Sequence, residues 1–199
     1  MHRSARRIAT WMAAALLAAS PAAASVWELD PAHSAAQFSV THMMVSTVRG
    51  QFQNVQGTVE MDDSNPANVK VDATIDATTI DTRQPKRDAH LKSADFFEVD
   101  KYPTITFKSK KSQKAGEGNY KVTGDLTMHG VTKEVVLDVT GVKSANGRMG
   151  ALATTKVNRK DFGLNWNKTL EAGGVVVSDD VDITLDIELV QKKAEAPKK

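Results

Sequence analysis

The sequence has no cysteine and few of the residue patterns that carry catalysis or metal binding. Without thiols the fold cannot use disulfides or cysteine-ligated metals, so its stability must come from a hydrophobic core. The chain has no Gly-x-Ser-x-Gly nucleophile elbow, and its five histidines never stand at a metal-ligand spacing such as His-x-His or His-x-x-x-His. These absences argue against a nucleophilic enzyme and against a metal site.

A large excess of positive charge is also missing. The chain has 26 Lys and Arg against 24 Asp and Glu, but three of the arginines fall within the first 24 residues. Beyond that point the balance is 23 against 24, which gives no electrostatic reason to expect a nucleic acid as partner. No later apolar stretch approaches the ~18 residues of a membrane-spanning helix, so no integral membrane segment is predicted there.

The first 24 residues have the three-part pattern of a secretory signal peptide. Arg3, Arg6 and Arg7 form a positive region, Ile8–Ala19 is an apolar run, and Ala22–Ala24 matches a small-residue cleavage pattern. We therefore predict that this segment is removed and that the mature protein is periplasmic.

Between this signal peptide (1–24) and a charged, flexible tail (191–199), residues 25–190 are predicted to form one domain. Apolar and polar residues alternate there with period two, most regularly in Val69–Ala77 and Val181–Leu189. Roughly eight such segments, joined by turns rather than helices, predict an all-β fold with antiparallel pairing. Such a sheet must close or stack to protect its edges, which leaves a barrel and a β-sandwich as candidates.

Two segments interrupt the alternation. The strand that starts at Ile105 and Phe107 is predicted to end in a polar, glycine-containing hairpin loop over 108–119. The segment 82–103 is predicted to contain one short helix, because Pro85 suits a first helical turn and good helix formers follow it.

The predicted helix begins with a group of cationic side chains. Arg83 and Arg87 stand at i and i+4, so on one helical face they would pair with a phosphate head group, with His90 close by. A solvated helix face is the alternative, and Asp88 is a competing partner for Arg87 or His90.

Aromatic side chains and one histidine complete the candidate site. Phe96 and Phe97 follow the helix and are predicted to be core residues that close or line one barrel end. His42 shares a strand face with Phe38 and Val40, although a structural histidine with satisfied hydrogen bonds would fit the same position.

The chain also carries several long motifs, spread from Val26 to about Leu189. They are WELDPAHS (27–34), FSVTHM (38–43), RGQF (49–52), RDAHLKSADFF (87–97), the pair Tyr102-Pro103, GDLTMHGVTK (124–133) and RKDFG (159–163). Together they resemble the YceI-like family of secreted, polyisoprenoid-binding, lipocalin-like proteins. That family often has Arg in place of Lys92 and Ile or Val in place of Met128, and these departures leave the resemblance intact.

The resemblance implies an extended eight-stranded antiparallel barrel, often a homodimer, with a long apolar channel for an isoprenoid lipid. A dry channel can hold such a chain because each buried methylene contributes about 0.8 kcal/mol. The inward positions expected to line it are Phe38, Val40, His42, Phe52, Val59, Ile75, Phe107, Leu126, Leu137, Phe162, Leu164 and Trp166.

We therefore predict a periplasmic binding or carrier protein rather than an enzyme. Its expected ligand is a long isoprenoid of the polyprenyl phosphate or quinone type, with no other cofactor and no metal. One alternative is a stress-response or structural partner module whose barrel is filled by its own side chains. Another is an enzyme acting on a bound lipid or amide, whose turnover would depend on His42 or His90.

Overall fold

The computed structural model describes residues 24–62, 65–171 and 173–192. The predicted signal peptide lies outside them except for Ala24, and so does the predicted tail beyond Lys192. Among the described residues, no helix combines the length and the apolar character needed to cross a bilayer. The strands of this part of the chain are β1 (Ala24–Leu29), β2 (Ala35–His42), β3 (Ser46–Phe52), β4 (Val55–Asp62), β5 (Asn65–Asp76), β6 (Thr104–Gly116), β7 (Asn119–Met128), β8 (Val131–Ala145), β9 (Arg148–Asn158) and β10 (Asp180–Gln191).

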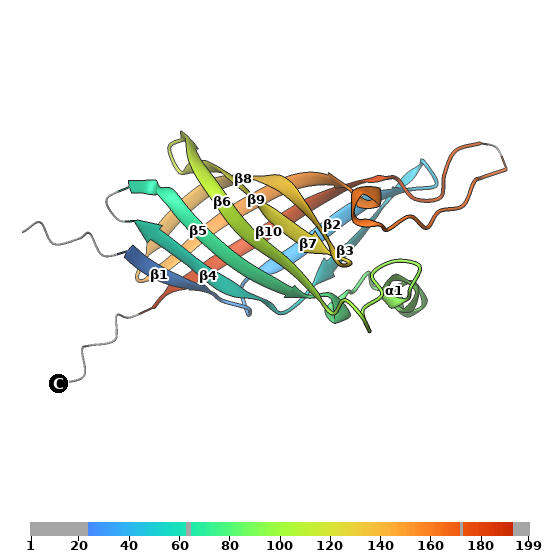
Figure 1. Ribbon diagram of the computed structural model, residues 1–199, viewed down its shortest axis with the longest axis horizontal. Coiled ribbons are helices and arrows are strands. Elements are labelled where there is room, and N and C mark those ends of the chain that lie inside the picture. The colour runs from blue at the N-terminus through green and yellow to red at the C-terminus, as the bar shows by residue number, and fades with distance from the viewer. Residues whose placement is uncertain (1–23, 63–64, 172, 193–199) are drawn as a thin grey trace, which may run out of the picture.

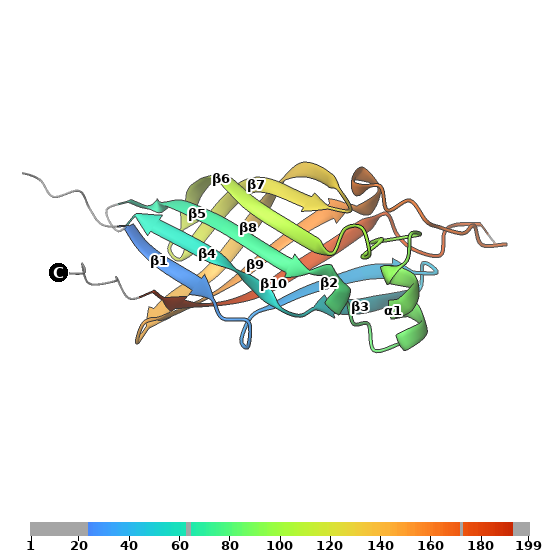
Figure 2. The same cartoon turned by 60° about the horizontal axis from the view of Figure 1, so that its bottom comes forward.

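These strands form one closed antiparallel barrel (Figures 1 and 2). β1 and β2 pair with successive parts of β10, at Leu29↔Leu189 and Ala36↔Leu185, so they share one position in the ring. β4 pairs with β1 and β3 pairs with β2, so β3 and β4 share the next position. The ten described strands thus fill eight positions, which confirms the predicted eight-stranded barrel rather than a sandwich.

The period-two alternation sets which side chains face the barrel interior. In β10, Val181, Ile183, Leu185, Ile187 and Leu189 point inward, and of the polar residues that alternate with them only Asp186 also borders the cavity. Because successive side chains of a strand leave opposite faces of the sheet, this sequence pattern directly specifies an apolar interior and a polar surface.

β6 is longer than the sequence predicted. The proposed loop over 108–119 is wrong, because residues as far as Gly116 pair with β7, with register shifts near Lys110 and Ala115. The hydroxyls of Ser109 and Ser112 also accept hydrogen bonds from backbone N–H groups of β5, at 2.7 and 2.9 Å. Both faces of this part of β6 are largely exposed, so no apolar alternation marks it as a strand.

The two ends of the barrel differ in construction. We call the end that carries the helix α1 (Pro85–Lys92) the helix end; the β2–β3 turn, the short 3₁₀ helix η2 (Arg159–Phe162) and the loop 163–179 lie there too. The opposite end, with the tight β6–β7 and β8–β9 hairpins, is the hairpin end. Figure 1 shows the helix end on the right and the hairpin end on the left.

The helix α1 confirms the single predicted helix. Pro85 occupies its first turn, the Gln84 side chain caps its amino end, and Ser93 caps its carboxyl end. The segment leaves β5 through a second 3₁₀ helix, η1 (Ala77–Thr79), and returns to β6. Reciprocal backbone hydrogen bonds between Gln51 and Asp81, both 2.9 Å, attach it to β3. The segment between β5 and β6 therefore continues the barrel wall beyond the last residue of β5 and the first residue of β6.

Candidate functional site

The barrel encloses a cavity of about 640 Å³, whose wall takes residues from all of the described strands. Many inward side chains, including Val71, Ile75 and Ile183, are only half-buried. Side chains that packed against one another across the barrel would be fully buried, as they are in a filled core. The interior is therefore hollow, which argues against a barrel filled by its own side chains.

Eleven of the twelve predicted lining residues lie on the cavity wall: Phe38, Val40, His42, Phe52, Val59, Ile75, Phe107, Leu126, Leu137, Leu164 and Trp166. The twelfth, Phe162, is 1% exposed and packs in the main core cluster instead. It belongs to η2, where helical geometry rather than period-two alternation sets the side-chain direction.

Two glycines allow aromatic rings to lie against the wall. A Cβ at Gly50 would stand 2.4 Å from Cζ of Phe38, and a Cβ at Gly124 would stand 2.5 Å from Cζ of Phe107. Phe38 is the direct cross-strand partner of Gly50. Because the glycines leave space beside the strand, these large side chains form part of the wall without filling the cavity.

The wall changes character from one end of the barrel to the other. The hairpin-end part is apolar apart from one phenol, and includes Met61, Val69, Tyr120, Val142 and Met149. All the lysine and arginine side chains of the described wall belong to the helix end: Lys86, Arg87 and Arg159. The only acidic residue on that wall, Asp186, pairs with Ala35 partway along the barrel. The cavity can thus hold an elongated amphipathic molecule.

Arg87 is held in place by Thr82, which is 3% exposed. Nε of Arg87 donates to the Thr82 hydroxyl and Nη2 donates to the Thr82 carbonyl, both at 2.8 Å. Asp88 in turn accepts hydrogen bonds from the Thr82 N–H at 2.9 Å and from its hydroxyl at 2.5 Å. Asp88 therefore orients Arg87 through Thr82, and Nη1 of Arg87 has no hydrogen-bond partner among the described residues.

Arg83 does not join Arg87 on a helical face. The helix begins at Pro85, and Arg83 precedes it with a φ of 62° and an exposed side chain. Its backbone N–H donates to the Asp81 carboxylate at 2.7 Å. The predicted i, i+4 geometry is therefore wrong, because the helix starts two residues later than it requires. Lys86, which the sequence did not single out as a site residue, accompanies Arg87 on the wall instead.

An aromatic cluster joins α1 to the loop 163–179. His90 lies 2.8 Å from the Asp95 carboxylate through Nε2, and its ring meets those of Phe96 and Trp166 edge-on, at centroid distances of 5.1 and 4.9 Å. Phe97 packs edge-on against Phe52 of β3. His90, Phe96, Phe97 and Trp166 all contribute to the cavity wall at the helix end.

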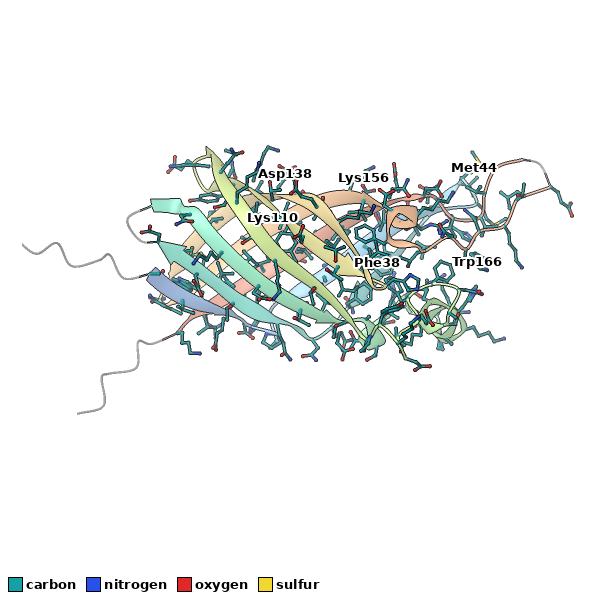
Figure 3. The ribbon with its side chains drawn as sticks, viewed as in Figure 1. Phe38, Met44, Lys110, Asp138, Lys156 and Trp166 are labelled. Carbon is teal, nitrogen blue, oxygen red and sulfur yellow. The ribbon has the colours of Figure 1, made fainter. Side chains whose placement is uncertain are left out.

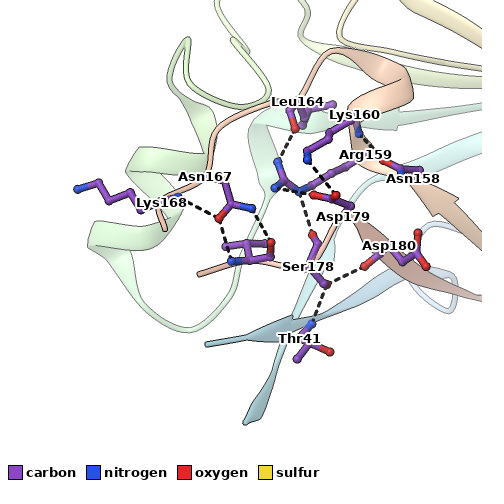
Figure 4. A network of polar contacts seen from close by, with 11 residues as sticks. Thr41, Asn158, Arg159, Lys160, Leu164, Asn167, Lys168, Ser178, Asp179 and Asp180 are labelled. Atoms are coloured by element: carbon purple, nitrogen blue, oxygen red, sulfur yellow. Dashed lines mark hydrogen bonds and ion pairs between the residues drawn. The ribbon is translucent and has the colours of Figure 1, made fainter. Parts of the chain in front are cut away.

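Arg159 fixes both ends of the loop 163–179, as Figure 4 shows. Its guanidinium donates to the carbonyl of Ser178 at 2.9 Å and to that of Leu164, and it forms an ion pair with Asp179 at 3.5 Å. Arg159 is 4% exposed, and this burial lowers the pKa of its guanidinium, while Asp179 acts in the opposite direction. Lys160 holds the other carboxylate oxygen of Asp179 at 2.9 Å.

The sequence did not single out Arg159 as a site residue. Arg159 belongs to the motif RKDFG, but an arginine beside Lys160 and Asp161 in a predicted loop has no pattern that distinguishes it from a solvated one. The only local feature that sets Arg159 apart is its place in the short polar run that ends the alternation of β9. Its burial follows from the folding of loop 163–179 back over η2, which is a tertiary contact.

One further charged cluster lies at the β1–β2 turn. Asp30, His33 and Glu188 bring possible metal-ligand atoms within 4.8 Å of one another. Arg148 donates to Asp30 at 3.0 Å and also to Glu188, so its guanidinium supplies the positive charge that a metal would bring. Hydrogen bonds, first from His33 and then from Arg148, lower the pKa of Asp30 from 3.8 to about 2. The cluster is explained as an ion-pair network that joins this turn to β9 and β10.

Comparison with known proteins places this barrel in a family. The model of the YceI-like domain matches residues 27–189. A UPF0312 protein from Staphylococcus aureus is 39% identical over 158 residues, covering 76% of this chain and 90% of that relative. A YceI protein structure from Campylobacter jejuni has a TM-score of 0.65 at 32% identity, with 77% of this chain and 90% of that chain covered. BcnA from Burkholderia cenocepacia has the same fold, with a TM-score of 0.72 at 24% identity over 80% of this chain and 98% of its own. The chain therefore belongs to the YceI-like domain family.

Proposed function

We propose that this protein binds and carries a long isoprenoid lipid, of the polyprenyl phosphate or quinone type, in the barrel cavity. The observation that carries the proposal is the hollow interior with an apolar wall along most of its length. Each methylene buried against such a wall contributes about 0.8 kcal/mol, so affinity grows with chain length. A domain from Saccharophagus degradans with this fold (TM-score 0.61, 16% identity) is described as polyisoprenoid-binding, which fits the same ligand class.

The dimensions of the barrel favour a long ligand over a compact one. β10 has 12 residues. At ~3.3 Å per residue and a tilt of ~40° to the barrel axis, such a strand spans about 30 Å along that axis. An extended chain lying along the axis would use this length, whereas a compact ligand would leave much of the apolar wall without a partner.

The polarity of the wall favours one orientation of the ligand. Its head group would lie at the helix end, where Lys86 and Arg87 can meet a phosphate or a quinone carbonyl, and its tail would point toward the hairpin end. The reverse orientation would bury a charged head among apolar side chains such as Val69, Val142 and Met149 without compensation.

We propose a periplasmic location from the signal-type pattern of the first 24 residues. Binding is preferred to catalysis because the cavity is hollow and its wall is apolar along most of its length. Both histidines named for the enzyme alternative, His42 and His90, lie on the wall. That alternative predicts a chemically altered lipid after incubation with the protein, and no alteration by His42→Ala or His90→Ala.

The direct test is to identify the lipid that the protein carries. Purified protein is extracted with organic solvent and the extract is examined by mass spectrometry, with a heat-denatured and washed sample as control. Separately, thermal unfolding is followed with added polyprenol, polyprenyl phosphate or quinone. At a free ligand concentration 100 times Kd, stability should rise by about 2.7 kcal/mol, which raises the Tm of a domain this size by roughly 5–10 °C. A protein that is empty after purification and gains no thermal stability from any of these lipids would contradict the proposal.

A further inference from the structure

Exposed apolar side chains gather at one point of the helix end. In the β2–β3 turn, Met43, Met44 and Val45 are 46%, 65% and 87% exposed, and Val175 of the loop 163–179 is 40% exposed. These four, which we call the apolar tip, are most of the large exposed hydrophobic residues in the described part of the chain. Such residues scattered singly need no explanation, but a group of them marks an interaction site.

Backbone contacts join the two loops of the apolar tip into one unit. The N–H of Met43 donates to the carbonyl of Val176 at 2.8 Å, and His42 forms an isolated β-bridge with Val177. The sulfur of Met44 lies over Gly174, where a Cβ would stand only 2.3 Å from it. The tip is therefore a defined projection, and Figure 3 shows Met44 beside the loop at the helix end.

The apolar tip is continuous with the cavity. His42, Val176 and Val177, which flank it in the chain, all contribute to the cavity wall. Lys86 is exposed and also lies on that wall, and Lys168 lies exposed on the same loop as Val175. The helix end of the cavity thus combines apolar side chains with cations, while Glu171 and Asp179 are the acidic residues in the described part of the loop 163–179, and Asp179 is paired with Arg159 and Lys160.

We propose that the apolar tip docks on the surface of an anionic phospholipid bilayer, so that the helix end of the cavity faces the membrane. Side chains projecting from two turns can enter the boundary between head groups and acyl chains, which lies within ~5–10 Å of the surface, while nearby cations meet anionic head groups. Four side chains fall far short of the roughly 800 Å² that each partner of a stable protein complex buries. A bilayer is therefore the better occupant than a protein.

This docking gives the proposed carrier a route for loading. A lipid could pass between bilayer and cavity beside the apolar tip without its tail crossing water. The inference rests on the proposed function for the purpose of the contact, but the contact itself can be measured without any isoprenoid.

The test is sedimentation of the purified protein with vesicles of phosphatidylcholine alone or mixed with phosphatidylglycerol. We expect binding to the mixed vesicles that weakens at high salt. The double variant Met44→Ser/Val45→Ser should bind them about tenfold more weakly or worse, because the inserted apolar surface is lost. The matched control is Leu152→Ser/Val190→Ser, which removes two exposed apolar side chains away from the tip and should bind like the unchanged protein.

Equal vesicle binding by the two double variants, or no binding of the unchanged protein to the mixed vesicles, would overturn the docking. Thermal stabilisation by detergent-dispersed polyprenol separates this result from the proposed function. We expect the Met44→Ser/Val45→Ser variant to retain that stabilisation while losing vesicle binding. An unchanged protein that binds vesicles without any stabilisation by polyprenol would contradict the proposed function and still support the docking.

Discussion

The two ends of this barrel are held together in different ways. At the hairpin end, adjacent strands are joined by tight turns, and exposed ion pairs such as Lys121–Asp138 lie on the outer surface. At the helix end, the strands give way to α1, η2 and the loop 163–179, which buried side chains hold in place. Arg159 binds two carbonyls there, and Thr82 is bound by both Arg87 and Asp88.

This difference separates the apolar part of the cavity wall from its cationic part. Backbone pairing builds the apolar part of the cavity and needs little from any single side chain. The helix end depends on particular polar side chains, and two of them, Arg87 and Arg159, also make its cavity wall cationic. Connecting segments on a rigid scaffold commonly carry specificity in this way. Changes at the helix end should therefore alter stability and selectivity together, whereas changes at the hairpin end should alter capacity alone.

The largest effect is expected from Arg159→Ala. The variant removes the bonds that fix the loop 163–179 and breaks a partly buried ion pair, so the free energy of unfolding should fall by about 3 kcal/mol in urea titrations. Lys160→Ala is the control, because Lys160 binds the same carboxylate of Asp179 from an exposed position. It should cost at most about 1 kcal/mol. Equal losses would show that the helix end does not depend on the buried arginine.

The next effect tests the apolar part of the wall. Ala151 lines the cavity beside its cross-strand partner Ile187 of β10, whereas its neighbour Leu152 points outward and is 39% exposed. Ala151→Trp should obstruct the cavity and lower the amount of lipid extracted per protein more than tenfold, because the indole occupies the path of the chain. Leu152→Trp adds a similar side chain outside the barrel and should leave the lipid content unchanged. Full lipid content in Ala151→Trp would place the ligand elsewhere.

A smaller and more selective effect is expected from Arg87→Ala. The variant should weaken the binding of polyprenyl phosphate by about tenfold, which corresponds to the loss of one charge-assisted hydrogen bond. Binding of the matching neutral alcohol should be nearly unchanged. Arg83→Ala is the control, since Arg83 is exposed and does not contribute to the cavity wall. Binding of both lipids by calorimetry decides the matter. An equal loss of affinity for the phosphate and for the alcohol would show that Arg87 only holds Thr82 in place and does not bind the head group.

The smallest effect concerns the ion pairs of the β1–β2 turn, away from both ends. The pKa of Asp30 is lowered from 3.8 to about 2, so the folded protein favours the ionised carboxylate. Its stabilising contribution is complete above pH 4 and is lost as the pH falls toward 2. Asp30→Asn should therefore be less stable than the unchanged protein at pH 7, and the difference should vanish near pH 2. A difference in stability that persists at pH 2 would show that the ionisation of Asp30 is not its cause. The lipid content of the variant should equal that of the unchanged protein.

The strands could be predicted from the sequence because alternation is a local property, but alternation left a barrel and a β-sandwich open, and only the family resemblance favoured the barrel. The pattern of Val181–Leu189 specifies one apolar face whatever the strand pairs with, and all nine of the predicted lining residues that lie on strands reach the cavity wall. Alternation does not predict the direction of a side chain where the strand geometry ends. Phe162 lies in a helical turn, Arg83 lies before the helix rather than on it, and β6 continues through residues exposed on both faces.

The sequence by itself therefore determined the strands, their apolar faces and the place of the single helix, whereas the closure of the sheet into an eight-position barrel is decided by the pairing of β1 with β10. The tertiary structure alone decided that the interior is hollow, because this depends on how far inward side chains reach across the ring. It also decided that Arg159 is buried and that Lys86, rather than Arg83, accompanies Arg87, since these positions follow from loops folding over one another. Period-two alternation sets the direction of a side chain, but only the closed ring sets the distance between opposite walls.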